Sequence, residues 1–263
     1  MRPTIDTSLD GHVHTRLCLH AKGEMEEYVQ AAIQKGLACL TFLEHLEVGI
    51  TYPHRTWLTP EDFEEYFREG QRLKQKYRDK IRIRLGVETG YNPEKVEEIR
   101  ARLEEYPVET VGLSYHFYRI ADGHYNMVSK SSFNMKALME EGAERVATQY
   151  FTTLLEAIQA LDVSFLCHLD AVLRHMPEMT LTRAHHQQID ALLDTMAARS
   201  IGLEINTSGI PHRGMPYPET DIIGRAVRRG IWLQAGSDAH TPTDVGRYFS
   251  QLPELIRESF MKP

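Results

Sequence analysis

The chain alternates short apolar runs with longer segments of helical period, and this alternation restricts it to a few folds. Parallel strands joined by right-handed crossover helices produce such a pattern, either as a closed barrel or as an open, doubly wound sheet. The apolar runs are 9–14, 38–45, 81–88, 110–116, 163–168, 201–206 and 231–238. Helices are expected over 24–36, 60–79, 93–104, 137–161, 182–199 and 219–229.

Composition limits the class of protein. A length of 263 residues suits one α/β barrel, so we expect a single domain over residues 1–263. The net charge of -7 disfavours a nucleic-acid polymer as partner. No apolar run is long enough to span a membrane, and the first residues do not resemble a signal peptide. The three cysteines lack zinc-finger spacing, and we interpret them as reduced thiols of a cytoplasmic protein.

Histidine, with 13 copies, is the unusual residue of this chain. Imidazole and carboxylate groups fall at the ends of nearly all the expected strands. In parallel α/β folds the carboxyl ends of the strands meet at one rim, where reactive residues collect. The residues at these positions are His12, His14, Glu44, His45, Glu88, His116, His168, Asp170, Glu204, Asn206, Asp238 and His240.

Such a collection predicts a metal site, because buried acids and imidazoles are costly without cations. Residues two apart on a strand point to the same side, so His12 and His14 can share one ion. The ligands exceed the needs of one ion, which suggests two or three zinc, iron or manganese ions joined by a bridging carboxylate. The remaining histidines lack strand-end placement, and His185 and His186 are expected to be solvated early in a helix.

The motifs, taken in order, resemble the polymerase and histidinol phosphatase (PHP) superfamily. They are HVH at 12–14, CLHA at 18–21, LEH at 43–45, GVE at 86–88, SYHF at 114–117, CHLD at 167–170 and GSDAH at 236–240. Within that group, LEINTSGIPHRGMPYPE at 203–219 is most similar to stand-alone histidinol-phosphate phosphatases. The resemblance implies a distorted seven-unit (βα) barrel, related to the TIM barrel, with a trinuclear metal centre.

The resemblance also implies which residues bind each ion. The first ion would take His12, His14, Glu88 and Asp238; the second Glu88, His116 and His168; the third His20, His45 and His240. Glu44 departs from the aspartate common before the second-strand histidine. It either orients His45 or is an exposed acid with a basic partner. Cys18 is expected to serve packing.

Clustered divalent cations suit hydrolysis of phosphate esters by an activated water. Asp238 and His240 are candidates for proton transfer, and Glu88 for the bridge between ions. A phosphomonoester also needs a positive anchor, for which Arg213 and Arg174 are the candidates, ahead of His212 and Arg119. The segment 120–136 is either a lid that sets specificity or a plain crossover loop.

These observations favour a metal-dependent phosphatase of histidine biosynthesis that hydrolyses the small substrate L-histidinol phosphate. A second enzyme hypothesis is a phosphodiesterase, or a phosphatase of another small phosphorylated metabolite or nucleotide. A third hypothesis, from a different class, is a non-catalytic metal-stabilised module. The complete set of motif residues disfavours the third, and the sequence does not determine the oligomeric state.

Overall fold

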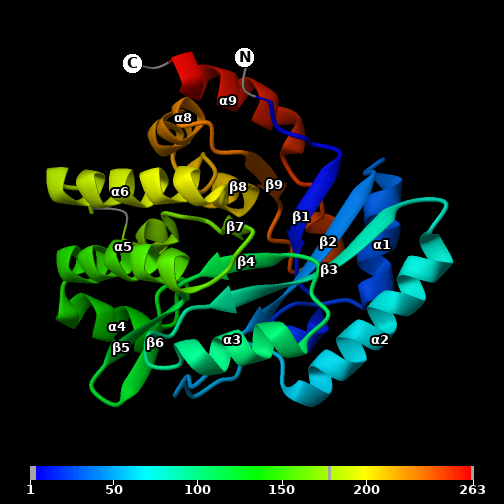
Figure 1. Ribbon diagram of the computed structural model, residues 1–263, viewed down its shortest axis with the longest axis horizontal. Coiled ribbons are helices and arrows are strands. Elements are labelled where there is room, and N and C mark those ends of the chain that lie inside the picture. The colour runs from blue at the N-terminus through cyan, green and yellow to red at the C-terminus, as the bar shows by residue number, and fades with distance from the viewer. Residues whose placement is uncertain (1–3, 177–178, 262–263) are drawn as a thin grey trace.

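The computed structural model describes residues 4–176 and 179–261 and contains a parallel barrel surrounded by helices (Figure 1). Its seven strands lie in the order β1-β2-β3-β4-β7-β8-β9, all parallel to their neighbours. A bridge between Val13 and Ala239 joins β1 to the end of β9, and the His14 amide donates to the Ala239 carbonyl at 3.0 Å. This contact closes the sheet and confirms the barrel over the open sheet. The strands are β1 Leu9–Val13, β2 Cys39–Leu46, β3 Arg82–Gly90, β4 Val111–Ser114, β7 Phe165–Leu166, β8 Gly202–Asn206 and β9 Leu233–Gly236.

Helices cover the outside of the barrel, and their apolar faces form the core with the strands. They are α1 Met25–Gln34, α2 Pro60–Tyr77, α3 Val96–Glu105, α4 Ser132–Glu141, α5 Ala143–Ala160, α6 Arg183–Arg199, α7 Ile210–Arg213, α8 Thr220–Arg228 and α9 Leu252–Met261. The expected helix 137–161 is two helices, because Gly142 adopts a φ of +95° between α4 and α5. The sequence pattern also missed α9. No described helix has both the length and the apolar character needed to cross a bilayer.

Four strands, β1, β4, β7 and β9, end one or two residues earlier than the sequence pattern predicts. β4 stops at Ser114 and β7 at Leu166, so His116 and His168 lie just beyond the sheet. His168 and Asp238 adopt positive φ angles of 23° and 49°. Such conformations are strained for non-glycine residues and persist where surrounding contacts enforce them, often at functional sites. The backbone therefore turns sharply at two of the expected ligands.

The open question about 120–136 has a structural answer. After His116 the chain leaves the barrel as an antiparallel hairpin, β5 Phe117–Ile120 and β6 Gly123–Asn126, and then enters α4. The segment therefore contains part of a hairpin and the start of α4 rather than a plain crossover loop, and its role in specificity stays a prediction.

His185 corrects one sequence expectation. It is 1% exposed, where the pattern predicted solvation. Its side chain accepts from the Thr182 amide at 3.1 Å as part of the N-terminal cap of α6, and its Nε2 lies 2.9 Å from the Thr148 hydroxyl on α5. The capping geometry turns the ring inward, which a helical pattern alone does not reveal.

Candidate metal centre

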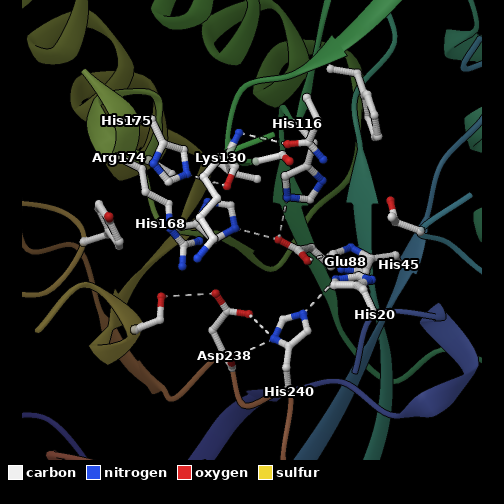
Figure 2. A pocket seen from close by; sticks show the side chains of 18 of the residues that line it. His20, His45, Glu88, His116, Lys130, His168, Arg174, His175, Asp238 and His240 are labelled. Atoms are coloured by element: carbon white, nitrogen blue, oxygen red, sulfur yellow. Dashed lines mark hydrogen bonds and ion pairs between the residues drawn. The ribbon is translucent and has the colours of Figure 1, made fainter. Parts of the chain in front are cut away.

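The structure brings all nine sequence-predicted ligands together at the carboxyl ends of the strands, and Figure 2 labels all of them except His12 and His14. Four of them belong to strands or follow β1 directly. The other five lie in the loops after the 3₁₀ helix η1, Arg16–Cys18, and after β4, β7 and β9. Seven are buried, whereas His20 and His240 face the open side of the cavity. They are His12, His14, His20, His45, Glu88, His116, His168, Asp238 and His240.

Glu88 stands at the middle of this ring, with histidines facing both of its carboxylate oxygens. It is 1% exposed, and the Ser114 hydroxyl donates to its Oε1. Around Oε2 lie His45 Nδ1 at 3.1 Å, His12 Nε2 at 3.4 Å and His14 Nε2 at 3.5 Å. Around Oε1 lie His168 Nε2 at 2.8 Å and His116 Nε2 at 3.3 Å. Because imidazole nitrogens lie around both of its oxygens, this carboxylate is placed to bridge cations that those rings would bind.

The pairing of His20 with His240 tests whether these residues fit metal ions. The Nδ1 of His20 is 2.9 Å from the Cys18 carbonyl, and that of His240 is 3.0 Å from the Asp238 carbonyl. Because a carbonyl only accepts, each Nδ1 carries the proton, and each neutral ring presents a lone pair at Nε2. These two Nε2 atoms lie 2.9 Å apart. Two lone pairs facing each other at this distance repel unless a cation lies near both, so the donor set fits divalent metals.

A second layer of acids holds the inner histidines. His12 Nδ1 donates to Glu204 Oε1 at 2.6 Å, and His116 Nδ1 donates to Glu47 Oε1 at 2.8 Å. Such hydrogen bonds fix the tautomer and raise the basicity of the opposite nitrogen. The sequence pattern noted Glu204 only as a strand-end acid and missed Glu47, whose position two residues after His45 was the available signal.

Glu44 belongs to this buried layer rather than to the surface. It is fully buried and accepts from the Thr15 amide at 2.8 Å and the Thr15 hydroxyl at 2.5 Å. Its nearest imidazole is His14, whose Nδ1 is 3.8 Å away, so the alternative of an exposed acid is wrong. Cys18 is also fully buried, and burial raises the pKa of its thiol.

The charges of the centre are strongly coupled. Burial alone would raise the pKa of Glu88, but His116, His12 and His45 hold it well below its usual range. Burial likewise opposes ionisation of Asp238, yet His14, His12 and His240 hold its pKa well below the ordinary value. Burial lowers the pKa of His240 to about 3, which keeps that ring neutral. Both acids are therefore carboxylates, as cation binding requires.

The two candidate phosphate anchors occupy different environments. Arg213 Nη2 lies 2.9 Å from Asp170 Oδ2 and also donates to the Pro216 carbonyl, while its guanidinium sits 4.0 Å from the centroid of the Tyr217 ring. Asp170 is fully buried, and that burial raises its pKa to about 6 against the opposing effect of Arg213. Arg213 is thus occupied by structural contacts.

Arg174, in contrast, lines the cavity of about 520 Å³ that opens above the centre. Within residues 4–176 and 179–261 it has no ion-pair or hydrogen-bond partner, and its only recorded contact is with the Tyr217 ring, 6.0 Å from the centroid. His212 also lines the cavity. Arg119 lies outside it and pairs with Glu94.

The chain is similar to known proteins over most of its length. A family model described as "PHP domain" matches residues 10–208. A Schizosaccharomyces pombe protein named "Probable histidinol-phosphatase" is 30% identical over 90% of this chain and 82% of its own length. The histidinol-phosphatase of Bacillus subtilis is 29% identical over 90% of this chain and 95% of its own.

A solved structure shares the fold over almost the whole chain. It is histidinol phosphate phosphatase from Lactococcus lactis, in complex with zinc, L-histidinol and phosphate. The TM-score is 0.81 at 23% identity, and the match covers 97% of this chain and 94% of that one.

Proposed function

This chain belongs to the PHP domain family, and from that premise we propose that it is a metal-dependent phosphomonoesterase that hydrolyses L-histidinol phosphate to L-histidinol and phosphate. The observation that carries the proposal is the ring of nine expected ligands with Glu88 at its middle, in a chain whose histidinol-phosphatase relatives match it over most of their length. The three cysteines are free and buried, which supports a reduced, cytoplasmic setting.

The ring divides into overlapping sets that would hold two or three ions. His12, His14 and Asp238 converge within 4.8 Å, which supports the first expected set with Glu88 as its bridge. His45 converges with Glu88 and His116, and also with His14 and His240, so it can serve either of two ions. Zinc, iron or manganese bound here would lower the pKa of a water molecule and neutralise charge on phosphate oxygens.

The protein residues then position the reacting groups and handle the proton. Asp238 is a carboxylate on the cavity wall, where its Oδ2 accepts from the Ser208 hydroxyl at 3.2 Å. Its Oδ1 lies 3.5 Å from His240 Nδ1. We assign Asp238 the role of accepting the proton of the attacking water, with His240 beside it, and of returning a proton to the leaving alkoxide.

Phosphate would be oriented by groups beyond the ring. Arg174 is the anchor we favour over Arg213, because it lines the cavity and has no carboxylate partner among the described residues. The centroid of the Tyr217 ring lies 6.0 Å from the guanidinium of Arg174 and 4.0 Å from that of Arg213, and its hydroxyl is buried without a hydrogen-bond partner in the described part of the chain. An unpaired buried hydroxyl costs free energy, which a phosphate oxygen in the cavity would offset.

The test is phosphate release by protein loaded in turn with manganese, zinc and iron. L-Histidinol phosphate is compared with bis-p-nitrophenyl phosphate and a nucleoside monophosphate. We expect kcat/KM for histidinol phosphate of about 10⁴ M⁻¹s⁻¹ or above and poor turnover of the others. Preferred turnover of the diester or the nucleotide would overturn the substrate assignment, and no hydrolysis by the metal-loaded protein would favour a non-catalytic module.

A further inference from the structure

The C-terminal part of the hairpin excursion, residues 117–131, is fastened by hydrogen bonds to the segments around it. The Met127 amide donates to the His116 carbonyl at 2.8 Å, directly behind a ring ligand. The Asn126 amide donates at 3.0 Å to the side chain of Asn134, which is fully buried on α4. His175 Nε2 donates to the Val128 carbonyl at 3.0 Å. These contacts determine where the end of the excursion lies relative to the metal centre.

Lys130 lies near the end of the excursion, and its side chain lines the cavity above the centre. Figure 2 shows it extending toward the ring in front of His168 and beside Arg174. Within the described ranges, 4–176 and 179–261, the Lys130 ammonium has no carboxylate partner and no recorded hydrogen bond. The other lysine of this region, Lys136 on α4, does not line the cavity, and its Nζ lies 3.9 Å from Glu140 Oε1.

Lys130 stands among other cationic or basic groups. Burial lowers the pKa of His175, and the charges of Arg174 and Lys130 lower it further. Burial also lowers the pKa of His212, again with contributions from Arg174 and Lys130. We call these four residues, Lys130, Arg174, His175 and His212, the cation wall. Its two cations, Lys130 and Arg174, have no carboxylate partner among the described residues, so they are poised for an anion.

We propose that the excursion delivers Lys130 as a second anchor, beside Arg174, for the phosphoryl group of the substrate. The inference rests on the proposed phosphomonoesterase function and adds to it a specificity residue that the strand-end pattern does not contain. It also assigns a purpose to the segment 120–136, which carries this lysine to the rim.

The chemical consequence is a preference for phosphomonoesters over phosphodiesters. A monoester at neutral pH carries close to two negative charges on three terminal oxygens, whereas a diester carries one charge on two. Two cations on the same wall, an ammonium and a guanidinium, therefore bind the monoester more strongly than the diester. Loss of Lys130 should therefore cost monoesters more than diesters.

The experiment measures binding of inorganic phosphate to the metal-loaded protein by calorimetry. The variants are Lys130→Ala and Lys130→Arg, with Lys136→Ala as the matched control from the same region. We expect Lys130→Ala to weaken phosphate binding by about tenfold or more. Lys130→Arg should retain most of the affinity, Lys136→Ala all of it, and metal content should be equal in the four proteins.

A second measurement compares turnover of p-nitrophenyl phosphate with that of its bis-ester. We expect the ratio of monoester to diester kcat/KM to fall in Lys130→Ala and not in Lys136→Ala. Wild-type phosphate affinity and an unchanged ratio in Lys130→Ala would overturn the proposal. Hydrolysis of every phosphomonoester releases inorganic phosphate, so these results do not depend on whether histidinol phosphate is the substrate.

Discussion

The ligand ring and the cation wall share one cavity but are built differently. The ring is deeply buried, and acids or backbone carbonyls hold many of its imidazoles from behind. The cation wall comes from the excursion, from the 3₁₀ helix Ala171–His175 and from α7, and its Lys130 is exposed. Metal ions require ligand distances correct within a few tenths of an ångström, whereas phosphate can be met by long, mobile cationic side chains. The contrast indicates that the ring determines the chemistry and the wall determines the substrate.

The largest effect should come from the middle of the ring. Glu88→Ala removes the carboxylate that five imidazoles surround, so we expect loss of bound metal. Catalysis should fall with it by about a thousandfold or more in kcat/KM, since clustered metals contribute several kcal/mol. Metal analysis and phosphate release check this, with Glu97→Ala on the exposed face of α3 as control. Full metal content and full activity in Glu88→Ala would contradict the assignment of Glu88 as the bridge between ions.

The next effect should come from the acids behind the ring. Glu204→Gln keeps the size of the side chain but removes the charge that accepts from His12 Nδ1 and, at 2.9 Å, from the His168 amide. We expect metal affinity to fall about 10- to 100-fold, measured by competition with a chelator. Glu98→Gln, on the solvent side of α3, serves as control. Unchanged affinity would mean that Glu204 only fills space and that the ring needs no support.

Most of the ligand ring could be predicted from the sequence because the ends of the strands could be predicted. The alternation of apolar runs located the seven strands, and parallel strands bring their carboxyl ends together. His12, His45 and Glu88 follow directly from that geometry. His20 depended on the family motif, since it lies in the loop after η1 and no strand period reaches it.

Glu47 and Glu204, the acids behind the ring, were harder to predict because the glycines that make room for them lie on other strands. A Cβ on Gly90 would lie 2.0 Å from the Glu47 carboxylate, and one on Gly236 would lie 2.0 Å from Glu204 Oε1. Each acid thus needs a glycine on a nearby segment. That pairing is visible only when the register of the strands is known.

The cation wall was the least predictable part. Arg174 and Arg213 look alike in the sequence, and only the buried Asp170 separates them by engaging Arg213. Likewise, nothing in the local pattern of 120–136 says that a hairpin there turns Lys130 toward the centre.

Arg174 and Arg213 allow a direct test of which groups bind the substrate and which hold the structure. Arg174→Ala should raise KM for a phosphomonoester about tenfold, the value of one charge-assisted contact, with metal content unchanged. Arg213→Ala should chiefly lower the melting temperature, because it leaves Asp170 buried without its partner. Steady-state kinetics and thermal denaturation of both variants separate the roles. The reverse assignment, with KM raised only in Arg213→Ala, would place the anchor at Arg213.

The smallest effect should come from the support of the cation wall. Tyr52→Phe removes only the hydroxyl that accepts from Asn134 Nδ2 at 2.7 Å, and Asn134 holds the excursion. A single hydrogen bond is worth about 1 kcal/mol, so we expect KM for a phosphomonoester to rise by about fivefold. Tyr125→Phe on β6, whose recorded ring contact is with Phe133, should leave KM unchanged.

Metal content and melting temperature should remain near wild type in both tyrosine variants, because neither touches the ring. If KM in Tyr52→Phe equals that of wild type, the wall does not depend on the excursion's fastening. If Tyr52→Phe instead loses metal, the ring and the wall are mechanically coupled, and the division of roles between them fails.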